Sequence, residues 1–452
     1  MKKLFGTDGV RGVANSELTA ELAYELGRAG AFVLTSAIHK PRILVGRDTR
    51  VSGHMLEAAL IAGIMSVGAD VIPVGVIPTP GIAFLTRYYS CDAGVMISAS
   101  HNPMEDNGIK FFDAYGYKLP DALEERIEKI ILEKQELPRP TGENLGRLIK
   151  LKNPKRDYMD FLLETIDVRL DGLKLVLDCA NGASSEIAPR LFEELGAEVL
   201  PFYNNPDGHN INKNCGSTHP DRISELVVEQ GADAGLAFDG DADRLIACDE
   251  RGGEIDGDHI LAVCALALNK EGKLAGNTVV GTVMSNMGLE KALKQQNIQL
   301  EKTGVGDRYV LEQMLAHKYT IGGEKSGHII FLNYNTTGDG MLSALQLLRA
   351  KVKSGLEMSK LVSVMRNMPQ VIVNVMVDNA AKNNFSEYPE IAEAISGAEL
   401  RLGDKGRVLV RASGTEPLIR IMIEGENKGE INALALNIAE KMVKAMNAKI
   451  KK

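Results

Sequence analysis

Short apolar runs alternate along most of the chain with longer stretches in which apolar residues recur every three or four positions. Runs of the first kind predict buried strands, and stretches of the second kind predict amphipathic helices. The first third of the chain contains predicted strands at 42–46, 70–76 and 93–97, and a predicted helix at 52–67 separates the first two. A second helix separates the last two. This order of elements is typical of an α/β domain.

The same order of strand, helix, strand, helix, strand occurs twice more. The second block has predicted strands at 173–177, 197–202 and 234–238, and helices near 186–195 and 221–230. The third block has predicted strands at 278–282, 299–302 and 319–322, and helices near 289–296 and 308–316. Because the pattern repeats while the letters do not, it predicts three related α/β domains.

The C-terminal part departs from this order. Its predicted elements are a strand at 371–377, a helix near 391–395, strands at 407–410 and 418–423, and a final helix from 430 to about 449. We therefore expect a smaller α+β domain, with a hinge at 366–369 before it. At about 150 residues per domain, 452 residues already predict three domains and allow four. The predicted domains are 1–154, 155–256, 257–367 and 368–452.

Composition and charge narrow the class of protein. The chain is 44% apolar and 25% charged, which is the balance of a folded globular protein, and its net charge of −8 argues against nucleic-acid binding. No apolar run reaches the ~18–20 residues of a membrane span, and the N-terminus lacks the apolar core of a secretory signal. The five cysteines lie far apart, which predicts reduced thiols. We expect a cytoplasmic protein without nucleic-acid or membrane partners; the oligomeric state stays open, a homodimer included.

Two loops at predicted strand ends carry candidate chemistry. The sequence SASHNP at 98–103 follows the strand at 93–97, where α/β sheets place ligand groups. Either Ser98 or Ser100 suits a nucleophile or phosphoryl carrier there, and a capped polar turn is the alternative. In DGDADR at 239–244, an extended backbone would point Asp239, Asp241 and Asp243 the same way. Oxygen ligands favour Mg²⁺, completed by a phosphate oxygen; a solvated acidic turn is the alternative.

Two further loops suit a sugar phosphate. In GGEKSGH at 322–328, Glu324 and Ser326 can hydrogen-bond sugar hydroxyls and His328 can carry a proton, although a glycine-rich hairpin explains the letters equally well. In RASGTEPLIR at 411–420, guanidinium, hydroxyl and backbone donors form a predicted phosphate clamp, the alternative being a turn with surface arginines.

Three shorter signals accompany these loops. Arg11 is expected in a flexible loop at 6–12 (GTDGVRG), Lys110 follows the serine loop, and Asp307 fits a helix N-cap. A serine, a metal site, a hydroxyl-reading loop and a clamp together suit phosphoryl transfer on a sugar phosphate, which depends on positioning and charge neutralisation. Because no Walker A loop is present in the sequence, ATP is not the expected donor.

The four loops, in this order and spacing, resemble the α-D-phosphohexomutase superfamily, and FGTDGVRG at the start is similar to its bacterial phosphoglucosamine mutase branch. The resemblance covers essentially the whole chain. It implies three α/β domains with mixed sheets and a smaller C-terminal α+β domain around a central cleft. It also implies interconversion of glucosamine 6-phosphate and glucosamine 1-phosphate through a 1,6-bisphosphate, a step towards UDP-N-acetylglucosamine for the bacterial cell wall.

The resemblance also implies roles for single residues, and it favours Ser100 over Ser98 as the serine that is phosphorylated. The catalytic residues that the resemblance implies are Ser100, Lys110, Arg11 and His328. His101 of the serine loop is a further catalytic candidate, and a role in supporting its loop is the alternative. The implied Mg²⁺ ligands are phosphorylated Ser100 and Asp239, Asp241 and Asp243. The expected substrate-binding residues are Arg244, Glu324, Ser326, Arg411, Ser413, Gly414, Thr415 and Arg420.

Two positions depart from the superfamily's usual pattern: Ser98, where Thr is common, and Lys325, where Gln or Met is common. Sugar choice is therefore less constrained than reaction type, and phosphomannomutase/phosphoglucomutase activity is the first alternative. A Mg²⁺-dependent sugar phosphatase and a non-catalytic sugar-phosphate sensor are two others. The intact Ser100, His101 and three aspartates argue against the sensor.

Overall fold

The structure is a computed structural model, which describes residues 4–6, 8–35, 40–378, 382–413 and 417–451. The chain divides into two compact units, and each is described by itself. The larger unit comprises Met1–Ser285 and Leu293–Val364, and the smaller comprises Asn286–Ala292 and Met365–Lys452. None of the helices in the described ranges is long and apolar enough to cross a membrane.

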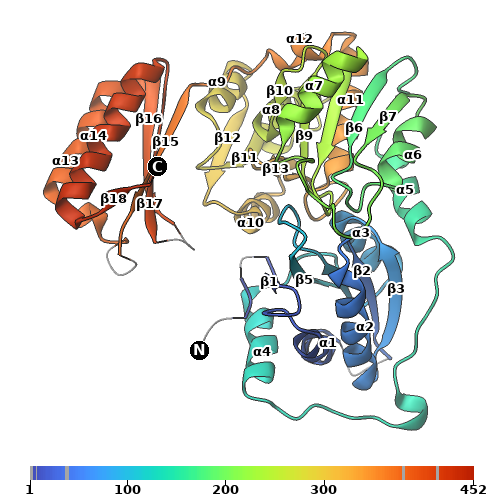
Figure 1. Cartoon of the computed structure of the whole chain (residues 1–452). Helices are drawn as coiled ribbons and strands as arrows, with labels where there is room; N and C mark the ends of the chain where they lie inside the picture. The colour runs from blue at the N-terminus through green and yellow to red at the C-terminus, as the bar shows by residue number, and fades with distance from the viewer. Residues whose placement is uncertain (1–3, 7, 36–39, 379–381, 414–416, 452) are drawn as a thin grey trace. The chain divides into compact units, whose positions relative to one another are not determined.

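The N-terminal part of the larger unit is a five-stranded sheet covered by helices on both faces (Figure 1). Its elements are β1 Val10–Val13, α1 Ala20–Leu34, β2 Arg42–Arg47, α2 Ser52–Ser66, β3 Asp70–Val76, α3 Thr79–Tyr88, β4 Ala93–Ile97, β5 Asp106–Asp113 and α4 Asp121–Leu132. The strand order is β1-β5-β4-β2-β3, in which β2, β3 and β4 are parallel and β5 and β1 are antiparallel to their neighbours.

The side chains of β2 and β4 explain why both faces are covered. Ile43 and Val95 belong to the main apolar core with α1, α2 and α4, whereas α3 packs on the other face. Helices α1 and α2 approach so closely that a Cβ on Gly63 would lie 2.1 Å from the carbonyl oxygen of Tyr24. Glycine is therefore required at this crossing, because any side chain would separate the two helices.

The second sheet follows the connecting helix α5 Pro154–Glu164. Its elements are β6 Lys174–Asp178, α6 Ile187–Glu194, β7 Glu198–Phe202, α7 Pro220–Gln230, β8 Ala234–Phe238, β9 Leu245–Asp249 and β10 Glu254–Ile255. The strand order is β10-β9-β8-β6-β7. Strands β6, β7 and β8 are parallel, and β9 runs antiparallel to β8. Apolar residues of α7, among them Ile223 and Val227, pack on Val176 and Ala237 of the sheet.

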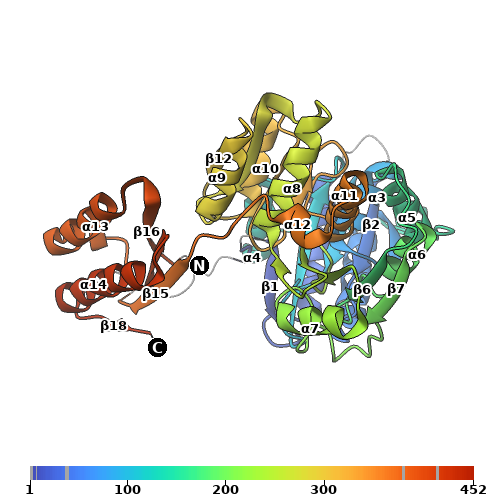
Figure 2. The same ribbon diagram turned by 90° about the horizontal axis from the view of Figure 1, so that it is seen from above.

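The third sheet has the order β12-β11-β13-β14. The elements of this region are α8 Gly257–Lys270, β11 Thr278–Thr282, α9 Met287–Gln295, β12 Gln299–Thr303, α10 Asp307–His317, β13 Ile321–Gly323, β14 Ile329–Phe331, α11 Gly340–Ser354 and α12 Met358–Val362. Helix α11 lies beside α8 (Figure 2). It also packs against β8 and β9 of the second sheet and against β14 of the third. Residues 340–350 of this helix are buried, and the helix therefore connects the second sheet to the third.

The smaller unit is a four-stranded antiparallel sheet of order β16-β17-β15-β18 with two helices packed on it. Its elements are β15 Gln370–Met376, α13 Pro389–Leu402, β16 Gly406–Ala412, β17 Leu418–Gly425, α14 Lys428–Met446 and β18 Lys449–Ile450. Alternate residues of β15 and β17, such as Val375 and Ile421, form its core with α13 and α14. The segment Asn286–Ala292, which includes the first part of α9, belongs to this smaller unit, where buried Glu424 accepts hydrogen bonds from Asn286 and from the backbone of Met287.

The structure confirms the predicted fold class of three related α/β regions and a smaller α+β region. The strands predicted at 70–76, 93–97, 234–238 and 278–282 have these bounds in the structure. The pattern did not predict β5, β9 and β14, each of which runs antiparallel to the strand before it in the chain. Each of these strands follows another strand across a polar loop, whereas the predicted pattern places a helix before every later strand.

One expectation about a local segment was wrong. Arg11 does not lie in a flexible loop, because residues 10–13 form β1 and Arg11 is paired with Gly108 of β5. The glycines around it suggested flexibility, but the adjacent strand supplies the hydrogen bonds that hold an edge strand in place.

Candidate active site

Ser100 lies just beyond the carboxyl end of β4 and is buried, with 1% of its surface exposed. Its φ of 51° is in the left-handed region, which costs a non-glycine residue roughly 1–2 kcal/mol. The Oγ atom donates a hydrogen bond to Oδ2 of Asp239 at 2.5 Å and lies 3.3 Å from Nδ1 of His101. Two predicted loops from different sheets therefore meet at this serine.

The aspartate loop 239–244 follows β8, but its geometry differs from the extended segment that we expected. Residues 240–242 turn, and Ala242 has a left-handed φ of 54°. The turn, and not strand alternation, brings oxygen atoms of Asp239, Asp241 and Asp243 within 4.8 Å of one another. A Cβ on Gly240 would lie 2.6 Å from the carbonyl oxygen of Ser100, so glycine permits the two loops to touch.

The three aspartates fit a divalent cation. All three are buried, and Oδ1 of Asp241 and Oδ1 of Asp243 are buried without a hydrogen-bond partner in the described part of the chain. Burial, together with the negative charges of Asp243 and Asp241, raises the pKa of Asp239 well above its usual value. A cation among these oxygens would relieve their repulsion, and an all-oxygen donor set suits Mg²⁺.

Lys110, on β5, supplies a positive charge beside the aspartates. Its Nζ lies 2.9 Å from Oδ2 of Asp241, 3.9 Å from Oδ2 of Asp243 and 3.0 Å from Oδ2 of Asp8. Burial lowers the pKa of Lys110, but the three carboxylates outweigh it and the net pKa is raised. The side chain therefore remains an ammonium ion and stabilises negative charge.

Asp8 was not among the predicted site residues, although it lies in the GTDGVRG motif. It contacts three cations: Arg11, Lys110 and Lys118. Burial raises the pKa of Asp8, but these cations lower it to a net value well below its usual range. Lys118 extends the network to Asp307, at 2.6 Å.

Asp307 is the first residue of α10, and Gly306 occupies the N-cap position that we expected for Asp307. Its carboxylate instead contacts Lys118 of the first region and Nε2 of His328, the latter at 3.4 Å. The network therefore connects the first and third sheets beside the aspartates. The sequence GDR at 306–308 predicted the start of a helix, but it did not predict the contacts of Asp307 with Lys118 and His328.

The loop that was predicted to bind the sugar is the turn of the β13–β14 hairpin, so the structure confirms the hairpin alternative. Oε1 of Glu324 accepts from the backbone of Gly306 at 3.1 Å. The Oγ atom of Ser326 is buried without a hydrogen-bond partner among the described residues. A buried hydroxyl without a partner can form a hydrogen bond to a ligand, and buried polar groups in proteins are otherwise almost always paired. Lys325 is half-buried, 3.8 Å from Asp256.

His328 reaches the aspartate loop from the end of the same turn. Its Nδ1 lies 3.5 Å from Oδ2 of Asp243. In the neutral ring Nε2 accepts from the backbone of Gly338 at 3.1 Å, and in the protonated ring it faces Asp307. Burial lowers the pKa of His328, but Asp243 and Asp307 raise it to a net value above its usual one.

The other predicted side chains around Ser100 are basic or neutral. Burial, with Arg244 and Arg11 nearby, lowers the pKa of His101 to about 4, so its ring is neutral at pH 7. The backbone of Arg244 donates to Asp239 at 3.2 Å. The Nε atoms of Arg11 and Arg244 are buried without a hydrogen-bond partner in the described ranges, which suits an anionic ligand.

Two more residues that the sequence pattern did not identify support these loops. Thr79, at the start of α3, donates its hydroxyl to Oδ2 of Asp241 at 2.6 Å, and its backbone N–H donates to the carbonyl of Asp241. Asn212 donates to the carbonyl oxygens of Ser100 and Asn102. Each bond joins the first region to the second, and isolated Thr and Asn residues give no sequence signal for such contacts.

The predicted phosphate clamp lies in the smaller unit. Arg411 of β16 and Arg420 of β17 are directly opposite each other. Burial and the charge of Arg420 lower the pKa of Arg411. Like charges at opposed positions repel, so a bound anion would stabilise this pair. Ser413 is buried, and its carbonyl accepts from Nζ of Lys382 at 2.8 Å; Gly414 and Thr415 lie outside the described residues.

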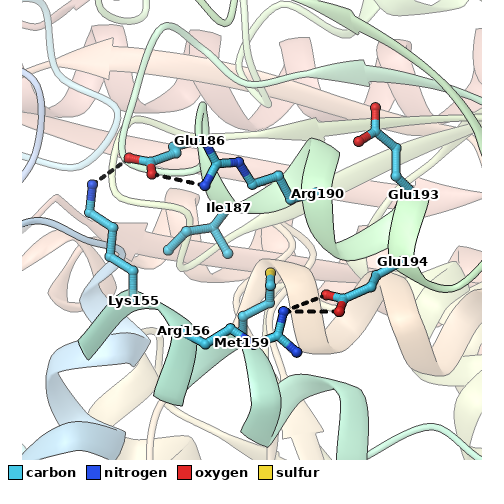
Figure 3. Close-up of a pocket in the computed structure, with 8 residues that line it drawn as sticks. All are labelled: Lys155, Arg156, Met159, Glu186, Ile187, Arg190, Glu193 and Glu194. Carbon is cyan, nitrogen blue, oxygen red and sulfur yellow. Dashed lines mark hydrogen bonds and ion pairs between the residues drawn. The ribbon is translucent and has the colours of Figure 1, made fainter. Parts of the chain in front are cut away.

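A separate hollow of about 440 Å³ lies between α5 and α6 (Figure 3). Its charged side chains largely neutralise one another: Lys155 and Arg190 pair with Glu186, and Arg156 pairs with Glu194. None of the predicted site residues lines it. The hollow therefore offers no concentration of charge for a sugar phosphate.

Family models match the chain along most of its length. Their descriptions read Phosphoglucomutase/phosphomannomutase, alpha/beta/alpha domain I at residues 2–138, domain II at 156–253 and domain III at 256–368, and C-terminal domain at 372–441. The four matches follow one another in the order of the sheets described above.

Relatives and solved structures agree with these matches. The phosphoglucosamine mutases of Thermoanaerobacter sp. (strain X514) and Clostridium novyi (strain NT) are 58% and 59% identical, each over 99% of this chain and 100% of the relative. A phosphoglucomutase/phosphomannomutase family protein from Burkholderia thailandensis has the same fold, with a TM-score of 0.82, 23% identity and 99% coverage of both chains.

A more distant structure is described with ligands. The N-acetylphosphoglucosamine mutase of Aspergillus fumigatus, in complex with GlcNAc-6P and magnesium, has a TM-score of 0.66 at 18% identity, over 98% of this chain and 96% of that one. Together with the full-length relatives and the family models, this shared fold leads to one conclusion: the chain belongs to the phosphoglucomutase/phosphomannomutase family of phosphohexomutases, among the phosphoglucosamine mutases.

Proposed function

We propose that the chain interconverts glucosamine 6-phosphate and glucosamine 1-phosphate, with phosphorylated Ser100 as the phosphoryl carrier and glucosamine 1,6-bisphosphate as the intermediate. The observation that supports this most is the hydrogen bond from the buried Ser100 hydroxyl to Asp239, one of three clustered aspartates. Full-length identity to phosphoglucosamine mutases supports the choice of sugar.

Asp239, Asp241 and Asp243 would hold Mg²⁺, with the phosphorylated Ser100 as a further ligand. The ion, when bound, supplies positive charge that neutralises the transferring phosphoryl group. Lys110 adds a fixed positive charge at the same oxygens, because its carboxylate neighbours keep it protonated. Phosphoryl transfer needs this kind of charge neutralisation more than it needs a strong nucleophile.

The proposed reaction consists of two transfers. In the first, the P–O bond to Ser100 breaks, a P–O bond to the free sugar hydroxyl forms, and the hydroxyl proton ends on Oγ of Ser100. In the second, the bisphosphate has reversed its orientation and its other phosphoryl group returns to Ser100, with the proton passing back to the sugar. The neutral ring of His101, 3.3 Å from Oγ, is suited to relay this proton.

The remaining predicted residues bind the sugar and its second phosphate. Glu324 and Ser326 are proposed to bind sugar hydroxyls, and the orphaned Oγ of Ser326 supports this role. Arg411 and Arg420, with Ser413, Gly414 and Thr415, are proposed to hold the non-reacting phosphate. Because the substrate reverses between the two transfers, one clamp must accept either phosphate.

The test is Ser100→Ala in a coupled mutase assay, with intact-mass analysis after incubation with glucosamine 1,6-bisphosphate. We expect wild-type protein and the control Ser396→Ala, which changes an exposed helical serine, to gain one phosphoryl group and to turn over. Ser100→Ala should do neither. Full mutase activity of Ser100→Ala would refute the proposal.

The choice of sugar is tested by comparing kcat/KM for glucosamine, glucose and mannose phosphates on the same preparation. We expect glucosamine phosphates to have the highest value. A higher value for mannose or glucose phosphates would assign the chain to that activity instead. Release of inorganic phosphate without isomer formation would indicate a phosphatase.

A further inference from the structure

Arg50 is the largest fully buried side chain of the described residues, and no step of the proposed reaction uses it. It lies in the loop between β2 and α2, and its side chain is 0% exposed. A buried guanidinium is costly unless its donors are all satisfied. Its partners therefore show what the residue does.

All five N–H donors of Arg50 have acceptors. The Nε atom donates to Oδ2 of Asp48 at 2.9 Å. The four remaining donors bind main-chain carbonyl oxygens between Ser100 and the first residue of β5, namely Ser100 at 3.0 Å, Asn102 at 2.8 Å, Asp106 at 2.9 Å and Pro103. One planar fork thus holds four carbonyl groups of a seven-residue loop in fixed relative positions.

Asp48 is linked to the backbone N–H of Ser100 through the hydroxyl of Ser98. Its Oδ2 accepts from Oγ of Ser98 at 2.6 Å, and that hydroxyl accepts from the backbone N–H of Ser100 at 2.9 Å. Both the N–H and the carbonyl of Ser100 are therefore bound, directly or through Ser98, to the Asp48–Arg50 pair. Ser98, the second candidate nucleophile of the sequence, is occupied in this chain of hydrogen bonds.

The conformation that these bonds hold is an unfavourable one. Ser100 has a left-handed φ of 51°, which an L-residue adopts only where the surroundings impose it. A buried ion pair is seldom more stabilising than apolar residues of the same volume, so a buried pair is better explained by the geometry that it enforces than by stability.

We propose that Arg50 and Asp48 are positioning residues that fix the backbone around Ser100, and that they act on phosphoryl transfer and not on sugar-phosphate binding. This inference rests on the proposed function, because it requires Ser100 to be the phosphoryl carrier. The loop must keep Oγ in line with the incoming oxygen in both transfers. A rigid loop meets this requirement without any contact between Arg50 and the substrate.

The experiment uses Arg50→Lys, which keeps the charge but loses the planar fork. The control is Arg28→Lys, since Arg28 is also buried in the first region but contacts Leu137 and Glu25 and not the serine loop. We expect Arg50→Lys to lower kcat by about 100-fold, the cost of a misplacement of about 1 Å. Its KM and its equilibrium affinity for glucosamine 6-phosphate should match the wild type.

Phosphorylation of Ser100 supplies a second readout. The rate at which glucosamine 1,6-bisphosphate phosphorylates the protein, followed by intact mass, should fall with kcat in Arg50→Lys and stay unchanged in Arg28→Lys. The proposal is overturned if folded Arg50→Lys keeps wild-type kcat. It is also overturned if both variants lose activity to the same extent, because that result would indicate general destabilisation.

If Arg50→Lys does not fold, the variant Ser98→Ala tests the positioning proposal instead. It removes only the link from Asp48 to the Ser100 amide, and we expect kcat to fall about tenfold at unchanged KM, the size of one neutral hydrogen bond. Wild-type kcat in this variant would then refute the proposal. Ser100→Ala is measured in parallel: if it is active the proposed function fails, whereas if it is inactive and Arg50→Lys is fully active only the positioning role fails.

Discussion

The Oγ atom of Ser100 lies 2.5 Å from Oδ2 of Asp239, although 139 positions separate the two residues in the sequence. The serine follows β4 of the first sheet and the aspartate follows β8 of the second. When Ser100 is not phosphorylated, its hydroxyl hydrogen forms a hydrogen bond to the carboxyl group of Asp239. A phosphorylated serine has no such hydrogen and carries negative charge, so a cation must then separate the two groups.

Mg²⁺ is expected to stabilise the folded chain. The three aspartates repel one another when no cation is bound, and a ligand at about 100 times its Kd adds about 2.7 kcal/mol. Thermal unfolding should therefore shift upwards on addition of Mg²⁺ and return on addition of a chelator. Asp241→Asn should lose most of this shift, and Asp404→Asn, an exposed aspartate, should keep it. An equal shift in both variants would place the ion elsewhere.

Asp8→Asn is expected to destabilise the chain at neutral pH. The change leaves Arg11, Lys110 and Lys118 with less counter-charge. Because Asp8 is partly exposed, we expect a loss of about 2 kcal/mol, between the values for exposed and buried pairs. The measurement is denaturant unfolding of wild type, Asp8→Asn and the exposed control Glu125→Gln.

The same variant should show a defined pH dependence. The folded pKa of Asp8 lies well below 3.8, so its stabilisation is complete above the unfolded value and is lost as the pH falls through the folded value. The stability difference between wild type and Asp8→Asn should thus be full at about pH 7 and shrink below about pH 4. A difference that grows in acid would contradict this assignment.

Gly240→Ala is expected to disturb catalysis by steric contact. The added Cβ would lie 2.6 Å from the carbonyl oxygen of Ser100, and backbone cannot move aside as a side chain can. A shift of about 1 Å predicts a loss of about 100-fold in kcat. The control is Gly397→Ala in α13, where a Cβ meets no described atom within 4 Å. This variant should be active and about 0.5–1 kcal/mol more stable.

Asp339 is expected to make stability fall as the pH rises towards neutral. Burial raises its pKa from 3.8 to about 6, even though Leu342, Tyr158 and Asn335 donate hydrogen bonds to it. Because the folded pKa exceeds the unfolded one, the folded state holds a proton that the unfolded state has lost between these values. Stability from this group is therefore full below about pH 4 and is lost as the pH rises through about 6.

Asp339→Asn tests this effect because it cannot ionise. The variant should gain about 3 kcal/mol on the wild type between pH 4 and pH 7, since one pKa unit corresponds to 1.36 kcal/mol. Melting curves of the two proteins across this range provide the measurement. A constant gap between the curves would show that Asp339 does not titrate in the folded protein near pH 6.

The periodic pattern of the sequence determined the class of each region. Val45 and Val95 lie in short apolar runs, and such runs can be buried on both faces only in a sheet covered by helices. The final antiparallel strands were not predictable in this way. Strand β5, with the sequence DNGIKFFD, mixes polar site residues such as Lys110 with core residues such as Phe112, so its alternation is broken by function.

The candidate site was predicted from local sequence wherever several chemical groups lie within one loop. Ser100, the three aspartates, Glu324 and the Arg411–Arg420 segment all stand in short loops at predicted strand ends. Their roles remain proposals. Asp8, Asp48 and Arg50 stand in the same kinds of loop but gave no signal, because their importance depends on partners 50 or more positions away.

The sequence alone thus determined the elements, the family resemblance and the chemical groups available, because these depend on residue types and their spacing. Only the tertiary structure decided how the groups are held. It placed the aspartates together by a turn with left-handed Ala242, and it bound the Ser98 hydroxyl between Asp48 and the backbone N–H of Ser100. The physical reason is that a hydrogen bond acts over about 3 Å in space, whereas the sequence records only order along the chain.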